Sequence, residues 1–383
     1  MKRRGYAVIG AILGLVALGS SRAIAQCPVS VLTTGLRVPT KIILSTKNNL
    51  LVAEGGNGPN TGRVSIIDPN SGVRRTLIDG LPAGFAPPNN DPSGPSGLAM
   101  QGRTLYVAIG LGDAVLSGPL PNSFVANPNP SSPIFSSVLA IHFSAATETN
   151  TSGVLLSFSD QVALKNGSQV ELSNGPGDKV SIDLVADFPD YLPEPRPGLP
   201  DGVRQSNPFG LALNGDQLYV ADASGNTVRV VDLETRSFSN LTTFGPIANN
   251  RGFGPPVVEA VPDSVQLAGN QLLVTLLTGF PFPIGRAEVR TVDVATGTNS
   301  PFIGGLTSAI DVLPRSDGFL TLEFSSDMLL GSPGRVSFYA TPTSPPVVVA
   351  NCLITPTSMT QGTRPGDLFV TEIFTGRVMK VTQ

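Results

Sequence analysis

Acidic residues recur at one place in a repeated pattern of this sequence. Four short apolar runs end in an acid, at Glu54, Asp222, Glu323 and Glu372. Carboxylates that converge on one point can hold a metal ion or exchange protons with a substrate. In three cases an arginine follows a few residues later, at Arg63, Arg335 and Arg377. Because equivalent positions of a repeat lie far apart, we predict acid–arginine pairs across hairpins rather than a metal ring.

Other side chains that commonly carry catalysis are scarce. The single histidine, His142, lies inside the apolar run 139–143, where a structural role in a strand is expected. The chain has no Gly-x-Ser-x-Gly turn, and neither of its two cysteines has a neighbouring base. We therefore assign no catalytic residue, and whether the protein is an enzyme stays open, since a mechanism based on carboxylates alone fits the sequence.

The segments that carry these residues repeat six times. A short apolar run follows a proline or threonine, and after a polar turn comes a second apolar run such as Leu-Tyr-Val-Ala-Asp. The lead-in residues are Pro39, Pro95, Pro208, Pro262, Thr307 and Pro356. The second runs start at Leu50, Leu105, Leu218, Leu272, Phe319 and Leu368, separated by 55, 113, 54, 47 and 49 residues. A repeat of short strands predicts a radial all-β array.

Four strands fit each repeat except the last, which ends after its third strand at 378–381. A spare strand at 29–33 precedes the first repeat, and pairing the two closes the ring and leaves no open edge. We therefore predict one domain over 26–383, an all-β, six-bladed β-propeller whose N-terminal strand completes the last blade. The long second repeat is predicted to be enlarged at about 112–188, with extra strands at 154–158 and 180–184.

The first strand of each blade is expected to line the central channel. The predicted lining is polar and consists of Thr40, Lys41, Ser96, Phe209, Asp263, Ser264, Ser308, Thr357 and Ser358. A divalent metal needs several converging ligands, so Asp263 alone is too few, and Lys41 repels cations. We predict a water-filled channel without a metal site, and we select Lys41, Asp263 and Ser96 as candidate ligand-binding residues.

Loop length differs between the two faces of the predicted propeller. Connections between second and third strands, and those between blades, emerge on one face, which we call the long-loop face. Its long segments are 55–62, 85–94, 112–136, 187–207, 245–261 and 278–286. Long ordered loops on a rigid scaffold are where binding usually occurs. This face is therefore the predicted binding surface, although loops that only decorate the rim are the alternative.

Aromatic residues gather on these loops, at Phe85, Phe124, Phe135, Tyr191, Phe253, Phe280 and Phe282. An exposed apolar cluster suits a hydrophobic ligand or a partner protein, whereas buried rings would only pack the loops onto the blades. From the loop at 278–286 we select Phe280, Phe282 and Arg286 as candidate ligand-binding residues.

The first residues have the pattern of an export signal. A basic start at 2–4 precedes an apolar stretch at 7–18 and a small-x-small site at 23–25, so we expect a signal peptide at 1–25. Without its four basic residues, 21 basic side chains remain against 28 acidic ones, a net charge of −7 that disfavours nucleic acid and anionic membranes. No other stretch is long and apolar enough to span a membrane. We predict a secreted or periplasmic protein.

Two cysteines in an exported chain can pair. Cys27 precedes the first predicted strand and Cys352 precedes the last repeat, so the two lie near each other in a closed ring. A disulfide and two separate thiols both fit the sequence, because spacing alone does not fix the Cα separation.

Some strings resemble known repeat families. The segment Asn207–Leu211, followed by 218–226, resembles NHL-type repeats. The segment Leu-Thr-Gly-Phe-Pro-Phe-Pro-Ile-Gly at 277–285, with Gly-Pro-Ser-Gly-Leu at 94–98, resembles the ScyD/ScyE family. That resemblance implies an exported six-bladed propeller; founding members occur in gene clusters for the sunscreen scytonemin. Wider similarity to lactonase-type propellers implies a metal hydrolase, but the channel positions here lack that ligand set.

Two functions follow from these observations. The first is an exported module that binds a small molecule or an extracytoplasmic protein through the long-loop face, without a cofactor. The alternative is an enzyme, either a metal-dependent, lactonase-like hydrolase with a divalent metal or a catalyst acting on an aromatic secondary metabolite.

Overall fold

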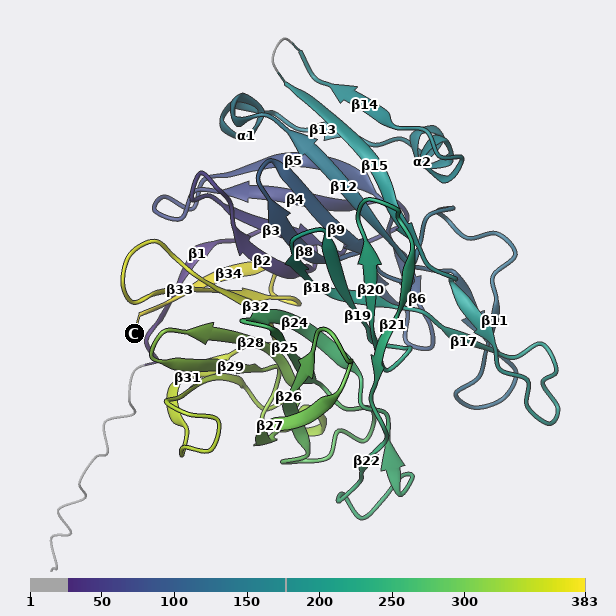
Figure 1. Cartoon of the computed structure of the whole chain (residues 1–383), viewed down its shortest axis with the longest axis vertical. Helices are drawn as coiled ribbons and strands as arrows, with labels where there is room; N and C mark the ends of the chain where they lie inside the picture. The colour runs from purple at the N-terminus through teal and green to yellow at the C-terminus, as the bar shows by residue number, and fades with distance from the viewer. Residues whose placement is uncertain (1–26, 176–177, 383) are drawn as a thin grey trace, which may run out of the picture.

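The computed structural model describes residues 27–175 and 178–382 as one all-β ring (Figure 1). The predicted signal peptide at 1–25 lies outside these residues. The first three blades consist, from the channel outwards, of β2 (Pro39–Leu44), β3 (Leu50–Glu54), β4 (Gly62–Ile67) and β5 (Arg74–Leu81); β8 (Pro95–Gln101), β9 (Thr104–Ile109), β12 (Ser137–Phe143), β15 (Lys179–Asp187) and β14 (Val170–Ser173); and β18 (Pro208–Asn214), β19 (Gln217–Asp222), β20 (Thr227–Asp232) and β21 (Phe238–Thr243).

The remaining three blades follow the same order. They consist of β24 (Pro262–Ala268), β25 (Gln271–Leu276), β26 (Ala287–Asp293) and β27 (Asn299–Leu306); β28 (Ala309–Arg315), β29 (Gly318–Glu323), β30 (Gly334–Tyr339) and β31 (Val347–Leu353); and β32 (Pro356–Gln361), β33 (Asp367–Glu372), β34 (Arg377–Thr382) and β1 (Val29–Thr33). The prediction of a six-bladed propeller closed by the N-terminal strand is confirmed, because β1 pairs antiparallel with β34.

The apolar cores lie between neighbouring blades. One cluster joins Leu320 and Leu322 of blade 5 to Leu368 and Val370 of blade 6. The second strands are buried along almost their whole length, and in β3 all five residues are buried. Since both faces of such a strand contact a blade, its sequence is a continuous apolar run rather than an alternation.

The enlarged second repeat differs in part from the prediction. The strand at 180–184 is confirmed within β15, but the strand expected at 154–158 is wrong beyond β13 (Val154–Leu155). Ser157 caps the helix α2 (Phe158–Lys165) through a reciprocal capping box with Asp160. A shorter helix, α1 (Ala145–Asn150), precedes it. β13 pairs in parallel with β5, so the insertion in repeat two covers the outer edge of blade 1.

The pairing of first with second strands shows that one predicted lead-in residue is wrong. Ala309 faces Glu323 as Pro39 faces Glu54 and Pro356 faces Glu372. The residue before three of these strand starts has a left-handed backbone, with φ of 58° at Val38, 54° at Ser308 and 47° at Thr355. Ala309, not Thr307, is therefore the lead-in residue of blade 5. The prediction that Ser308 lines the channel is therefore wrong. Ile310 and Asp311 occupy the positions that Thr40 and Lys41 hold in blade 1.

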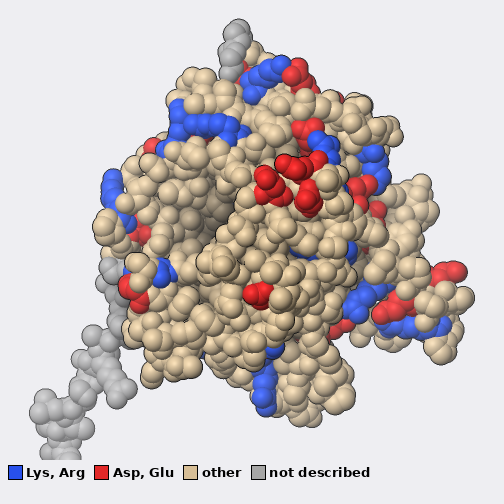
Figure 2. Space-filling model, in the orientation of Figure 1, with Lys and Arg blue, Asp and Glu red and all other residues tan. Residues whose placement is uncertain are grey.

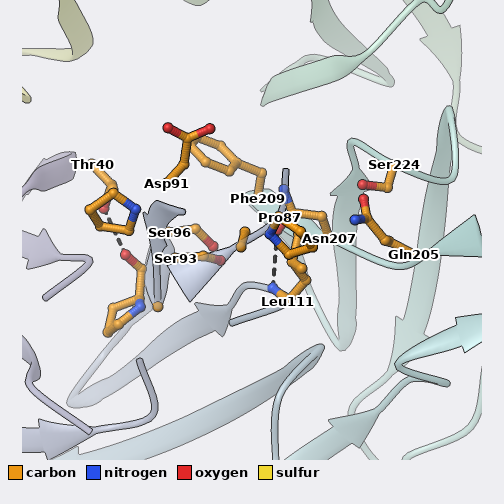
Figure 3. Close-up of a pocket in the computed structure, with 14 residues that line it drawn as sticks. Thr40, Pro87, Asp91, Ser93, Ser96, Leu111, Gln205, Asn207, Phe209 and Ser224 are labelled. Atoms are coloured by element: carbon orange, nitrogen blue, oxygen red, sulfur yellow. Dashed lines mark hydrogen bonds between the residues drawn. The ribbon is translucent and has the colours of Figure 1, made fainter. Parts of the chain in front are cut away.

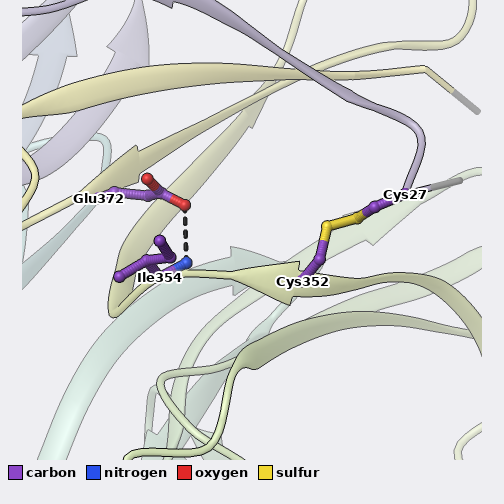
Figure 4. Close-up of a disulfide and its surroundings, with 4 residues drawn as sticks. All are labelled: Cys27, Cys352, Ile354 and Glu372. Atoms are coloured by element: carbon purple, nitrogen blue, oxygen red, sulfur yellow. Dashed lines mark hydrogen bonds between the residues drawn. A yellow bond between two sulfur atoms is a disulfide. The ribbon is translucent and has the colours of Figure 1, made fainter.

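Chain closure includes a disulfide between Cys27 and Cys352, whose Cα atoms are 6.2 Å apart (Figure 4). Of the two alternatives in the sequence, the structure contains the bridge. It connects the segment before β1 to β31 in blade 5, the neighbour of the blade that β1 completes.

Short elements stand on the long-loop face. They are the ribbons β6 (Gly84–Ala86) with β7 (Asp91–Ser93), β10 (Val115–Ser117) with β11 (Phe124–Ala126), β16 (Tyr191–Pro193) with β17 (Val203–Gln205) and β22 (Ile247–Ala248) with β23 (Val257–Val258), and the 3₁₀ turn η1 (Met328–Leu330). All four ribbons belong to segments predicted to be long. The connection at 324–333, which contains η1, is a long segment that the sequence analysis missed.

Candidate functional site

The repeated acids form structural pairs, as predicted. Arg229 lies 2.7 Å from Asp222, and Arg377 lies 2.5 Å from Glu372. The pairs Glu54–Arg63 and Glu323–Arg335 complete a set that we call the outer ring. Each carboxylate also accepts a backbone N–H from the connection entering its own blade, such as Ile354 N–H to Glu372 at 2.7 Å (Figure 4). Each acid therefore ties a hairpin to the start of its blade, and Arg229 is a partner the sequence analysis missed.

Six equivalent residues surround the channel, one from each blade. Each follows the first residue of its blade's first strand by two positions. This set, which we call the belt, comprises Lys41, Gly97, Gly210, Ser264, Asp311 and Ser358. The two glycines are required by close approach, because a Cβ at Gly97 would lie 1.9 Å from the Phe209 carbonyl oxygen. Blades 2 and 3 therefore contribute no side chain to the belt.

Lys41 reaches across the channel. Its ammonium lies 3.1 Å from the Asp311 carboxylate of blade 5, and the two side chains are 6% and 1% exposed. Asp311 also accepts hydrogen bonds from the hydroxyls of Ser264 (2.6 Å) and Ser358 (2.9 Å). A buried ion pair with this many hydrogen bonds is fully satisfied. The predicted water-filled channel is therefore occluded at the belt.

Asp263, one step before the belt, has no hydrogen-bond or ion-pair partner among the described residues, although it is 5% exposed. Burial raises the pKa of its carboxyl well above the ordinary value; the Lys41 ammonium opposes this and the Asp311 carboxylate adds to it. The equivalent residues Thr40 and Ser96 each donate a hydroxyl to the next blade, at 2.8 Å to the carbonyls of Pro95 and Pro208. Asp263 thus holds a carboxyl of raised pKa at the position where Thr40 of blade 1 and Ser96 of blade 2 hold a hydroxyl.

Above the belt, the channel opens into the mouth hollow on the long-loop face, about 250 Å³ in volume. Figure 3 shows Thr40, Ser93, Ser96 and Gln205 among the side chains around it. A second hollow of about 320 Å³ lies below the belt, between the first strands of blades 1 to 4, and Lys41 lines it. The belt therefore separates the two ends of the channel.

Two further hollows continue from the mouth hollow across the long-loop face. The middle hollow, about 310 Å³, shares Gln205 and Ser224 with the mouth hollow. The outer hollow, about 530 Å³, shares Arg204 and Glu259 with the middle one. Three hollows with shared walls thus run from the channel over blades 3 and 4.

The shared walls are polar but electrically paired. Arg204 lies 3.2 Å from Glu259 and donates to the Ser224 carbonyl at 2.9 Å. Asn226 donates to the same Glu259 carboxylate at 3.1 Å. The Nε2 of Gln205 is enclosed and has no partner among the described residues. These walls carry no net charge, and they offer hydrogen-bond donors and acceptors to a ligand.

An aromatic cluster stands at the far end of the row. Phe280 lines the outer hollow, is 60% exposed, and meets Phe282 edge-to-face with ring centroids 6.0 Å apart. Phe253, 51% exposed, meets Phe280 at 6.5 Å. Arg251 fixes this cluster, since it donates to the Phe282 carbonyl at 3.1 Å and pairs with Asp327 at 2.7 Å.

The candidate residues fall in three places. Phe280 and Phe282 lie together over blade 4, and the exposed Arg286 ends the same loop. Ser96 lies in the mouth hollow, whereas Lys41 and Asp263 lie buried at the channel centre. Of the loop aromatics, Phe135 is a core residue at 1% exposure. The structure therefore does not unite these candidates in one site.

Sequence reasoning missed Arg204, Gln205 and Glu259, which form the shared walls. Their positions lie in connections without a repeated pattern, so no signal marked them. Asp311 was missed for a different reason. It follows the strand start by two residues, as Lys41 does, and a correct lead-in for blade 5 would have found it.

Charged residues make up only 14% of the chain. Figure 2 shows a largely uncharged surface on the viewed side, with a hollow left of centre and charged groups mainly above and to the right. Within the described ranges, no three or more His, Cys, Asp or Glu side chains gather to hold a metal ion. None of the helices in the same ranges has the length and apolar character needed to cross a membrane.

No family model matches the chain, and no curated protein matches it. Among solved structures, the chain is similar to one in a nidogen/laminin complex, with 11% identity over 85% of each chain and a TM-score of 0.43. It is similar to the computationally designed Ika8 protein, with 10% identity over 92% of this chain and 99% of that one and a TM-score of 0.39. It is also similar to PQQ-bound aldose sugar dehydrogenase from Streptomyces coelicolor, with 12% identity over 94% and 98% and a TM-score of 0.49.

The class of the protein rests on its own strand order. Six sheets, each starting at the channel with four antiparallel strands and stacked around it, define a six-bladed β-propeller. This fold serves both binding modules and enzymes, so the function has to be argued from the site.

Proposed function

We propose that the protein is an exported binding module that holds a small molecule or an extracytoplasmic protein segment across the long-loop face. The observation that carries this proposal is the row of three hollows with shared walls. A continuous row suits an elongated ligand better than a single compact one.

The chemistry of the row favours a ligand rich in hydrogen-bonding groups. The Arg204–Glu259 pair carries no net charge, while the amides and hydroxyls of Gln205, Asn207 and Ser224 both donate and accept. At the outer end, the exposed ring of Phe280 offers an apolar face for stacking. The proposed ligand is thus polar along its length and ends in an apolar or ring-shaped group.

Export and family form part of the same proposal. The basic and apolar start of the sequence and the Cys27–Cys352 bridge support a secreted or periplasmic protein. The string at 277–285, which includes Phe280 and Phe282, supports membership of the ScyD/ScyE family. No cofactor is invoked for binding.

The test is a thermal-shift screen with oligosaccharides, lactones, proline-rich peptides and divalent metal ions, since a ligand of the native state raises the melting temperature. For each oligosaccharide, lactone or peptide that binds, we expect the Phe280→Ala/Phe282→Ala double variant to lose about tenfold or more in affinity, whereas binding of a metal ion alone would favour the alternative of a metal-dependent enzyme. The matched control is Phe158→Ala, which removes a comparably exposed ring (55%) from α2. Compounds that bind the double variant as tightly as the wild type would refute the proposed site.

A further inference from the structure

A separate hollow lies over blades 5 and 6, also on the long-loop face. It measures about 320 Å³ and shares no lining residue with the three hollows of the row. Three connections enclose it: 324–333 with η1, 354–355 before β32, and 373–376 after β33. We call it the blade 5–6 hollow.

The walls of this hollow are apolar and uncharged. None of its ten lining residues is acidic or basic, and six of them are large or cyclic apolar residues: Phe324, Met328, Pro333, Leu353, Ile354 and Phe374. The rings of Phe324 and Phe374 meet edge-to-face with centroids 6.5 Å apart. An uncharged wall with ring edges suits a neutral aromatic ligand, because a charged ligand would lose its hydration without gaining a partner.

The lip of the hollow exposes apolar side chains to water. Phe374 is 69% exposed, Ile354 is 50% exposed, and Leu330, on η1 between the lining residues Met328 and Gly331, is 79% exposed. Large apolar side chains gathered around a concave site usually mark a binding surface. A ligand seated here would remove apolar area of both partners from water.

One polar atom in the wall lacks a partner. The Oγ1 of Thr355 is enclosed and has no hydrogen bond among the described residues. An enclosed hydroxyl without a partner destabilises the free protein, and a ligand that hydrogen-bonds to it would remove that cost. This atom therefore favours a ligand that carries one hydrogen-bonding group.

Size limits the ligand to about two rings. An engineered apolar cavity of roughly 150 Å³ holds benzene, and the blade 5–6 hollow is about twice as large. We infer that the blade 5–6 hollow is a second ligand site, which binds a neutral two-ring aromatic molecule with one hydroxyl, independently of the row of hollows over blades 3 and 4.

The test is a titration of the full-length mature protein with 2-naphthol, followed by the fluorescence anisotropy of the probe. The chain contains no tryptophan, so the emission of the naphthol is not masked. We expect saturable binding at one molecule per chain. The Phe374→Ala variant should bind about tenfold more weakly, because one ring of the wall is lost. That ring is exposed, so its removal leaves the fold intact.

A second variant tests the hydroxyl alone. Thr355→Val keeps the shape of the side chain, and valine is tolerated in this backbone conformation, since Val38 and Val261 occupy the equivalent position with φ of 58° and 54°. We expect this variant to bind 2-naphthol about fivefold more weakly and naphthalene as tightly as the wild type does. Phe280→Ala, in the other site, should change neither affinity.

Three results would overturn the inference. They are binding to the wild type that does not saturate, equal affinity in Phe374→Ala and the wild type, and equal effects of Thr355→Val on 2-naphthol and naphthalene. A loss caused by Phe280→Ala would instead place the probe in the row of hollows and would also count against a second site.

Discussion

The outer ring and the belt place carboxylates in two different settings of the same architecture. In the outer ring, four acids occupy one repeated position, and each pairs with an arginine and a backbone N–H. In and beside the belt, only blades 4 and 5 carry acids, and these two differ: Asp311 is fully bonded, whereas Asp263 has no partner among the described residues.

In a repeat protein, the partners of a group separate a role in the architecture from a role special to one blade. A group that recurs with the same kind of partners, as Glu372 does with Arg377, stabilises each of its four hairpins in the same way. A group present in one blade only, such as Lys41 or Asp263, has no equivalent in the other blades. The repeated architecture therefore does not account for its presence. Functional candidates are therefore best sought where the blades differ.

The largest effect is expected when the belt is broken at Asp311. Asp311→Ala leaves the ammonium of Lys41 buried without its carboxylate partner, and it removes the acceptor of the Ser264 and Ser358 hydroxyls. Removing one partner of a buried ion pair costs about 3–5 kcal/mol. We expect a loss of this size in the free energy of unfolding, measured by urea denaturation.

The control for this prediction replaces both charges. In Lys41→Met/Asp311→Leu neither charge of this pair remains, so the double variant should recover much of the lost stability. If the single variant unfolds at the same urea concentration as the wild type, the belt contributes nothing to stability and the comparison with the outer ring fails.

A smaller and repeated effect is expected in the outer ring. Arg229→Met and Arg377→Met each remove a guanidinium but leave the carboxylate its backbone N–H, from Asn207 and Ile354 respectively. Losing a hydrogen bond to a charged group costs about 1.5–3 kcal/mol. We expect similar losses in both variants, and their sum in the double variant because distant sites are independent. Unequal or coupled losses would contradict a purely architectural role.

The smallest change in the free energy of unfolding is expected for Asp263→Asn at mildly acidic pH. This change should grow as the pH rises. Burial raises the pKa of Asp263 in the folded protein, so the native state holds a proton that the unfolded chain releases above a pKa of about 3.9. Wild-type stability should therefore fall as pH increases from about 4 towards the raised pKa. The variant lacks this carboxyl, so its stability relative to the wild type should rise over the same range in urea titrations. A constant difference would show that Asp263 does not titrate there.

The sequence predicted the architecture well because the repeat encodes it locally. The lead-in prolines, the buried second strands and the spare strand at 29–33 were sufficient for blade number and closure. The helix α2 was missed because Leu155 and Leu156 resemble a strand, while the Ser157–Asp160 capping box was not recognised. Tertiary pairing of β13 with blade 1 had no sequence signal at all.

The site was predicted only in outline. Loop length pointed to the face that carries the row of hollows, and to the ring pair Phe280–Phe282. The shared walls depend on contacts between connections far apart in sequence, such as Arg204 with Glu259, and no local pattern reports these. The sequence also overestimated the number of exposed aromatic side chains, because Phe135 packs into the core. Its ring lies so close to Gly112 that a Cβ at that position would collide with it.

The Cys27–Cys352 bridge has a consequence for biosynthesis. Its two thiols are 325 residues apart in the chain, and β1 finds its neighbour β34 only in the final stretch. A chain emerging N-terminus first must keep its leading thiol reduced until almost everything else has been made. With only two cysteines, an early oxidation has no partner within the same molecule and would instead join two unfinished chains.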